Sequence, residues 1–160
     1  MIALKLTHDE PKLVYLALVY HLGRPGSELD ADTKQPLEQG LRAVKTALGN
    51  ELSAESAVIQ LDERGYQRLL SAIYGTVNEL RVHHLREGAT STVGRFTETA
   101  TSLFPELASE PEAALDIAEA MMMLHRRIER AVRTASGEGA GSDVPQAPPE
   151  RARWWPFGRR

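Results

Sequence analysis

The chain has 160 residues, a net charge of −3 at pH 7 and no cysteine. This length suits one domain plus a tail, and the lack of cysteine excludes disulfides, thiolate catalysis and cysteine-ligated zinc. The charge is uneven: residues 1–135 hold 15 Lys and Arg against 19 Asp and Glu, whereas residues 151–160 hold four Arg and no acid. An acidic body disfavours broad nucleic-acid binding, which needs a basic face.

The N-terminal region predicts a short strand followed by a helix. Residues 2–6 alternate apolar and other side chains, as in a half-buried strand. Thr7 and Glu10 have the Thr-x-x-Glu spacing of a capping box, which predicts a helix start. The run 13–20 is apolar on every side, so we expect this helix to be buried all round. The run is shorter than the roughly 20 residues that span a bilayer, and we expect the protein to be cytoplasmic.

A second helix is predicted over about 33–48, and a second strand over 57–61. The helix carries one apolar stripe at spacings of four and three, formed by Leu37, Leu41, Val44 and Leu48. Asp62 follows the strand and can cap a long third helix over about 63–86. Gly75 inside that helix costs about 1 kcal/mol relative to alanine, so we expect it to mark a close helix contact or a kink.

The two strand-to-helix segments resemble each other at a constant offset of 55 residues. Residues 4–7 (Leu-Lys-Leu-Thr) correspond to residues 59–62 (Ile-Gln-Leu-Asp), and the apolar positions of the helices that follow also correspond. This offset suggests a duplicated unit of strand, helix and connecting segment. We therefore expect the two strands to lie side by side, with each strand leading directly into a helix.

Two further helices are predicted in the C-terminal part of the domain. A shorter fourth helix ends before Pro105, and Ser109 and Glu112 have a capping-box spacing that predicts the start of a fifth helix ending near Thr134. Its inner face would be Ile117, Met121, Leu124, Ile128 and Val132, and its C-terminal end carries Arg126, Arg127, Arg130 and Arg133. Residues 121–123 are consecutive methionines that span about 200° of a helix. At least one should leave the core, and it could pack in a homodimer.

These elements predict an α+β, predominantly helical fold with two short paired strands and about five helices. The globular domain would cover residues 1–135. Residues 136–150 contain eight Gly, Ser or Pro, a composition typical of a flexible linker. The C-terminal tail, residues 151–160, is predicted to be disordered on its own.

The tail is the most informative stretch of the sequence. It holds both tryptophans of the chain, one of three phenylalanines and four arginines. Large aromatic side chains at a mobile terminus are expected to contact a partner. The candidate partner-binding residues are Arg151, Arg153, Trp154, Trp155, Pro156, Phe157, Arg159 and Arg160.

Motifs that would support catalysis, cofactor binding or a metal site are missing from the sequence. There is no Gly-x-Ser-x-Gly elbow and no phosphate-binding loop. The five histidines show none of the His-x-x-x-His or Glu-x-x-His spacings that mark zinc or di-iron sites. We name no catalytic, cofactor-binding or metal-ligating residues, and the sequence favours a protein that is not an enzyme.

The sequence leaves three functions open. The first is a non-enzymatic adaptor or regulator whose tail binds a protein groove or an anionic membrane surface, with self-association of the domain. The second is a small enzyme or ligand-binding domain whose site gathers His and carboxylate groups from separate helices. The third is weak nucleic-acid binding through the tail and the arginines at 126–133, with tryptophans stacking on bases.

Overall fold

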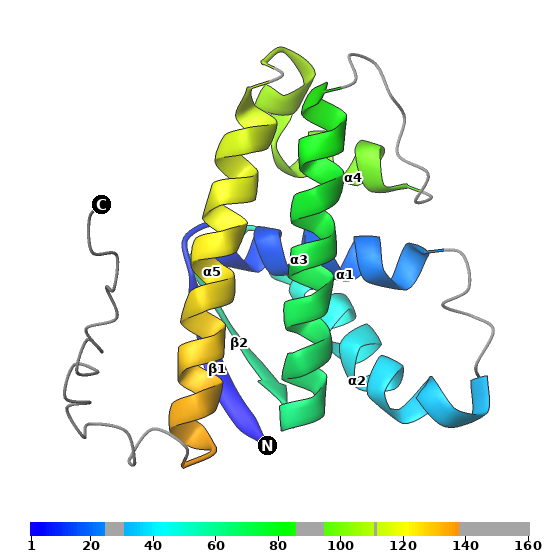
Figure 1. Ribbon diagram of the computed structural model, residues 1–160, viewed down its shortest axis with the longest axis vertical. Coiled ribbons are helices and arrows are strands. Elements are labelled where there is room, and N and C mark those ends of the chain that lie inside the picture. The colour runs from blue at the N-terminus through cyan, green and yellow to red at the C-terminus, as the bar shows by residue number, and fades with distance from the viewer. Residues whose placement is uncertain (25–30, 86–94, 111, 138–160) are drawn as a thin grey trace, which may run out of the picture.

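The computed structural model describes residues 1–24, 31–85, 95–110 and 112–137, with the backbone alone for 31–37 and 83–85. Within these residues the fold is α+β and predominantly helical, as the sequence predicts. Five α-helices, one short 3-10 helix and a two-stranded sheet follow one another along the chain (Figure 1). No helix in the described part of the chain combines the length and the apolar character needed to cross a membrane.

The two predicted strands pair with each other, which confirms the expectation from the 55-residue offset. Strand β1 (Ile2–Thr7) runs antiparallel to β2 (Ser56–Leu61), with Leu4 opposite Ile59. Leu4 and Ile59 are also equivalent under the offset, so the pairing is symmetric about this residue pair. The inward side chains of both strands are buried except for the half-buried Ile2, and Lys5, Val58 and Gln60 point outward.

Each strand leads directly into a helix. Strand β1 precedes α1 (Glu10–Gly23), and β2 precedes α3 (Glu63–Leu85). Helix α1 crosses behind α3 and contacts β1, α2 (Ala31–Asn50), α4 (Phe96–Leu103) and α5 (Ala113–Ala135) (Figure 1). It is therefore the central helix of the fold, which accounts for its apolar character on every side.

Helices α3 and α5 lie side by side and antiparallel, and together they form the front layer in Figure 1. The predicted inner face of α5 is buried throughout, from Ile117 to Val132. A single hydrophobic cluster joins the sheet to all five α-helices. In α2, Leu41, Val44 and Leu48 belong to this cluster as predicted, while the side chain of Leu37 falls outside the described part.

Of the three predicted helix starts, one is right, one is partly right and one is wrong. The Asp62 carboxylate accepts a hydrogen bond from the Gly65 N–H at 2.7 Å, so Asp62 caps α3 as predicted. The Glu10 carboxylate accepts from the Thr7 N–H at 2.8 Å, but the Thr7 hydroxyl donates to Glu10 instead of capping a backbone group.

The predicted capping box at Ser109 is wrong. A short 3-10 helix, η1 (Pro105–Ala108), precedes this point, and the Ser109 N–H donates to the Glu106 carbonyl at 3.1 Å. Ser109 thus closes η1, and α5 begins later, at Ala113. At its other end α5 stops at Ala135, and Gly137 adopts a φ of +77°, a left-handed conformation that glycine tolerates at the end of a helix.

Gly75 marks a close helix contact, one of the two roles expected for it. A Cβ at this position would lie 2.6 Å from Cε1 of Tyr20 on α1. The Tyr20 ring also makes an edge-to-face contact with Phe96, with ring centroids 5.7 Å apart. The absence of a side chain at Gly75 therefore lets α1 and α3 approach each other.

Candidate functional site

All eight residues proposed for partner binding, Arg151 to Arg160, lie outside the described part of the chain, as does most of the predicted linker. The core of the described residues contains three large buried aromatic side chains, Tyr66, Phe96 and Phe104, which come from α3, α4 and the junction with η1.

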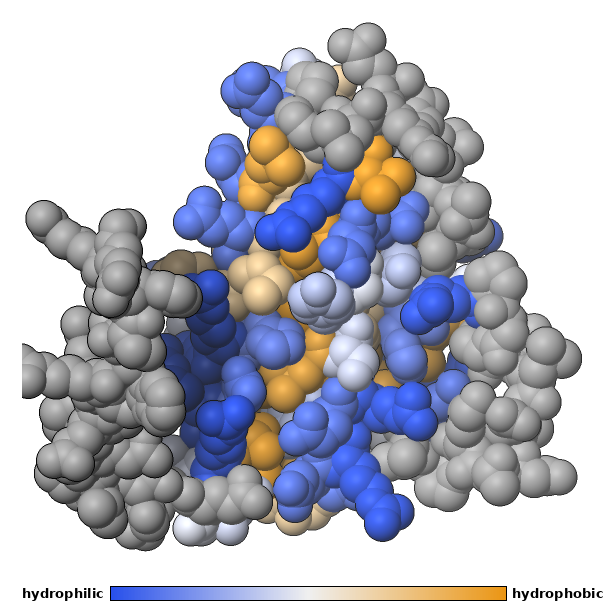
Figure 2. Space-filling model, in the orientation of Figure 1, coloured by the Kyte–Doolittle hydropathy of each residue, from blue (hydrophilic) through white to orange (hydrophobic). Residues whose placement is uncertain are grey.

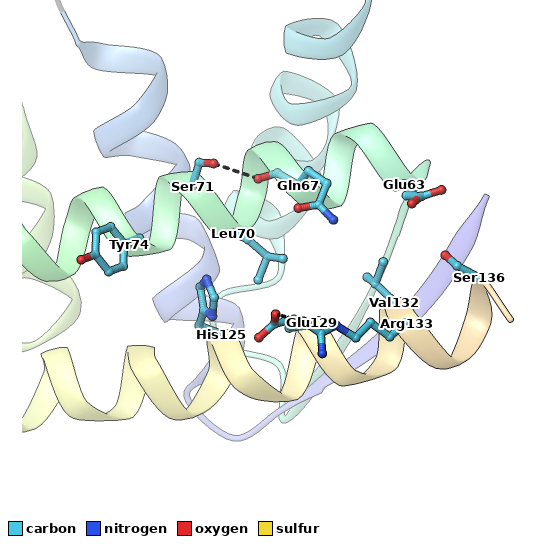
Figure 3. A pocket seen from close by; sticks show the side chains of 10 residues that line it. All are labelled: Glu63, Gln67, Leu70, Ser71, Tyr74, His125, Glu129, Val132, Arg133 and Ser136. Carbon is cyan, nitrogen blue, oxygen red and sulfur yellow. Dashed lines mark hydrogen bonds and ion pairs between the residues drawn. The ribbon is translucent and has the colours of Figure 1, made fainter. Parts of the chain in front are cut away.

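A groove runs between α3 and α5 on the outward side of the molecule (Figure 3). One part of it has a volume of about 570 Å³ and is lined by polar residues of both helices, among them Gln67, Ser71 and Tyr74 on α3 and His125 and Glu129 on α5. A second hollow of about 380 Å³ lies further along the same helix pair, between Arg81 and the α5 residues Leu115, Met122 and Met123. The groove thus has a polar part and a more apolar part.

The polar groups of the groove are spread along its length. Figure 3 shows Glu63 near Ser136 at one end, Tyr74 near the other end, and His125 pointing between the two helices. Glu129 is already engaged, because Arg133 donates to it at 2.8 Å. This arrangement can hold a polar ligand by hydrogen bonds, and it places His125 and Glu129, four residues apart on α5, on the same side of the groove.

The histidines do not converge in the described part of the chain. His8 is exposed in the turn between β1 and α1, His21 is half-buried on α1, and His125 lies in the groove. Burial lowers the pKa of His21, with Glu38 opposing the shift and Arg68 and Arg24 adding to it. No group of three metal-ligating side chains occurs among the described residues, and the side chains of His83 and His84 fall outside them.

The four arginines expected at the end of α5 fall into two classes. Arg126, Arg130 and Arg133 are exposed. Arg127 instead turns toward the sheet, where it donates to the Glu10 carboxylate at 2.6 Å and to the Lys5 carbonyl at 3.2 Å. Arg127 therefore fixes α5 to the β1–α1 junction. Sequence alone gave no sign of this role, because its partners lie more than 115 residues away.

Tyr66 holds the two strands in place as well, and no pattern in the sequence indicated this role. Its ring is fully buried, and its hydroxyl lies 3.3 Å from the carbonyl oxygens of both Ile2 and Ile59. Burial raises the pKa of Tyr66 to about 12. The hydroxyl therefore stays protonated at neutral pH and serves as a structural donor to the sheet.

The three consecutive methionines separate as expected. Met121 is fully buried, Met122 is half-buried and Met123 is 63% exposed. Met123 thus lies on the outward side of α5, away from the core.

Comparison of the chain with protein-family models, curated proteins and solved structures finds no match.

Proposed function

We propose that the protein is a non-catalytic adaptor or regulator. Its domain makes one interaction, by self-association, and its tail (residues 151–160) makes another, with a protein groove or an anionic membrane surface. The observation that carries the proposal is the distribution of aromatic residues: both tryptophans lie in the tail, while the core of the described residues buries Tyr66, Phe96 and Phe104.

The chemistry of the tail supports this role. Trp154, Trp155 and Phe157 would anchor in the partner, since each large aromatic side chain can bury about 150–250 Å². Pro156 would favour an extended peptide, and the arginines would supply attraction to an anionic partner.

The expected affinity of a single tail is modest. At about 25 cal/mol per Å², three aromatic anchors represent roughly 10 kcal/mol before any cost. Association and ordering cost an estimated 4–15 kcal/mol. A single tail therefore binds weakly, and two tails on one assembly would bind more tightly through their effective concentration.

The test compares four forms of the chain: full length, residues 1–137, Trp154→Ala with Trp155→Ala, and Arg151→Ala with Arg153→Ala. Each is assayed by pull-down and by flotation with neutral vesicles and vesicles containing anionic lipid. A protein groove predicts that the tryptophan changes abolish pull-down. A membrane surface predicts flotation that follows the anionic lipid and depends more on arginine. If truncation at residue 137 alters neither readout, the proposal is wrong.

A second candidate, a ligand-binding domain or small enzyme, is favoured by the groove between α3 and α5. His125 and Glu129 on α5 line it together with Gln67 and Tyr74 on α3, so a small polar ligand would meet donors and acceptors from both helices. Thermal-shift screening of the full chain against small polar metabolites tests this function. A rise in melting temperature that His125→Ala removes would favour it over the adaptor.

The third candidate, nucleic-acid binding, would use the tail with the exposed Arg126, Arg130 and Arg133. This function predicts that the protein binds single-stranded oligonucleotide with an affinity that falls steeply as the salt concentration rises.

A further inference from the structure

A stripe of six charged residues with Met123 at its centre runs along the outward side of α5. Its seven exposed members recur at alternating spacings of four and three residues, the spacing that keeps side chains in line along a helix that faces a partner helix. They are Glu112, Asp116, Glu119, Met123, Arg126, Arg130 and Arg133. We call them the α5 stripe. Every charge before Met123 is negative, and every charge after it is positive.

The charged residues of the α5 stripe lie on the surface of the molecule. In Figure 2 the deepest blue gathers over the C-terminal half of α5, and paler blue lies over its N-terminal half. The inner face of the same helix is buried against the core, so the α5 stripe points away from the domain.

Interactions within α5 alone do not explain the order of charges in the α5 stripe. The helix dipole favours acids in the first turn and bases in the last, but Glu119 and Arg126 lie closer to the middle of α5. Like charges three or four residues apart repel, and the stripe repeats this arrangement, as in Asp116 with Glu119 and Arg126 with Arg130. In the described part of the chain, the ion pair within α5 joins Arg133 to Glu129, which is outside the stripe.

A helix of opposite charge order would relieve this repulsion, and the chain itself supplies one. We propose that the α5 stripe pairs with the α5 stripe of a second copy of the chain, antiparallel and about a two-fold axis at Met123. In this register Glu119 faces Arg126 of the second copy, and Asp116 faces its Arg130. The two-fold axis repeats each pairing, which makes the interface self-complementary.

The dimer is weak and sensitive to salt. Exposed ion pairs contribute little each and are screened by salt, and one helix pair buries less surface than a standard interface. The exposed Met123 side chains supply the apolar contact at the centre.

The antiparallel arrangement places the C-terminal ends of the two α5 helices about 35 Å apart, because each helix has 23 residues with a rise of 1.5 Å per residue. This pairing rests on the self-association part of the proposed function, and it does not depend on the tail's partner.

Charge reversal tests the pairing in the full chain by sedimentation equilibrium at low salt. One variant carries Asp116→Arg with Glu119→Arg, and the other carries Arg126→Glu with Arg130→Glu. We expect each variant alone to dimerise at least about tenfold more weakly than the natural chain, because like charges then face each other. An equimolar mixture should form a heterodimer at least as tight as the natural dimer, because the reversed charges then face opposite charges.

The matched control is Arg64→Glu with Arg68→Glu, two exposed arginines four residues apart on α3, which should leave dimerisation unchanged. Circular dichroism melting checks that every variant is folded. A mixture that stays monomeric, a natural chain that is monomeric at every concentration, or a control that weakens the dimer equally overturns the proposal.

Crosslinking gives a second readout that tolerates some loss of stability. The natural chain has no cysteine, so Met123→Cys introduces a single thiol at the expected two-fold axis. A short bis-maleimide should convert this variant to covalent dimer. It should leave Val58→Cys monomeric, although Val58 is 61% exposed on the outer face of the sheet. Equal crosslinking of the two variants contradicts the proposed register.

Discussion

The two strand–helix units, β1–α1 and β2–α3, agree at some buried positions of their helices and differ at positions that are buried in one unit only. Ala17 and Leu18 on α1 correspond to Ala72 and Ile73 on α3 at the 55-residue offset, and all four are buried. By contrast, the buried Leu16 corresponds to the exposed Ser71. Because α1 is covered by α2 and α4 as well, it needs apolar residues where α3 has polar ones.

Where α1 and α3 touch, the corresponding residues of the two units differ in size and fit together. Tyr20 on α1 corresponds to Gly75 on α3, and these two residues pack against each other. A tyrosine in both units would overfill the contact, and a glycine in both would leave a void. Two similar units in one chain can thus divide a contact into a large and a small residue, which identical subunits cannot do.

The largest effect on stability should come from exchanging the residue types at the corresponding positions 16 and 71. Leu16→Ser is expected to lower the free energy of unfolding by about 3–5 kcal/mol, because it leaves a cavity and buries a hydroxyl. Ser71→Leu should change it by less than about 0.5 kcal/mol, because position 71 is exposed. Urea unfolding followed by circular dichroism gives both values, and equal losses would contradict the difference between the two helices.

A smaller effect is expected where α1 and α3 touch. Gly75→Ala should destabilise the fold by a net value of up to about 2 kcal/mol, since overpacking costs about 1–3 kcal/mol and helix propensity returns about 1 kcal/mol. Shortening the facing side chain with Tyr20→Leu should remove the penalty. A double-mutant cycle measures this coupling, and strictly additive changes would show that the contact does not limit the approach of the helices.

The Tyr66 hydroxyl belongs to one unit only, since Pro11 stands at the corresponding position. Tyr66→Phe should cost about 1–2 kcal/mol through the loss of the donor to Ile2 and Ile59. The folded-state pKa of about 12 exceeds the ordinary value of 10.0. The unfolded chain therefore loses its proton first as the pH rises from 10 to 12, and stability falls in this window.

Comparing the stability of the natural chain and of Tyr66→Phe at two pH values separates the contribution of this tyrosine from that of other groups that titrate between pH 10 and 12. Urea unfolding of the natural chain and of Tyr66→Phe at about pH 9 and about pH 11 isolates its share. The difference in stability between the two chains should narrow at the higher pH. A constant difference would show that the hydroxyl ionises alike in both states.

The sequence predicted the features that depend on local pattern. Alternating residues marked both strands, and Asp62 marked the start of α3. The apolar run at 13–20 marked a helix that is buried on most sides, although Tyr15 and Val19 are only half-buried. The failures have physical causes. Ser109 was assigned to α5 because a 3-10 helix of four residues leaves little periodicity, and the role of Arg127 depends on a contact with β1 that no local pattern contains. The groove arises only when α3 and α5 pack side by side.

The smallest effect on stability is expected from removing the tail. Deleting residues 138–160 should leave the melting temperature nearly unchanged, because a segment rich in Gly, Ser and Pro cannot bury enough apolar surface to stabilise the domain. Differential scanning calorimetry of the full and truncated chains checks this. A fall of several degrees in the truncated chain would mean that the tail contributes to the fold.

Tryptophan fluorescence tests the central claim of the proposed function most directly, because Trp154 and Trp155 are the two tryptophans of the chain and both lie in the tail. The account predicts that free protein, dilute enough to be monomeric, emits like solvent-exposed indole and is fully quenched by iodide. A partner groove or anionic vesicles should shift the emission to shorter wavelength. Emission typical of buried tryptophan in the free monomer would contradict the account, because the tail would then dock on its own domain.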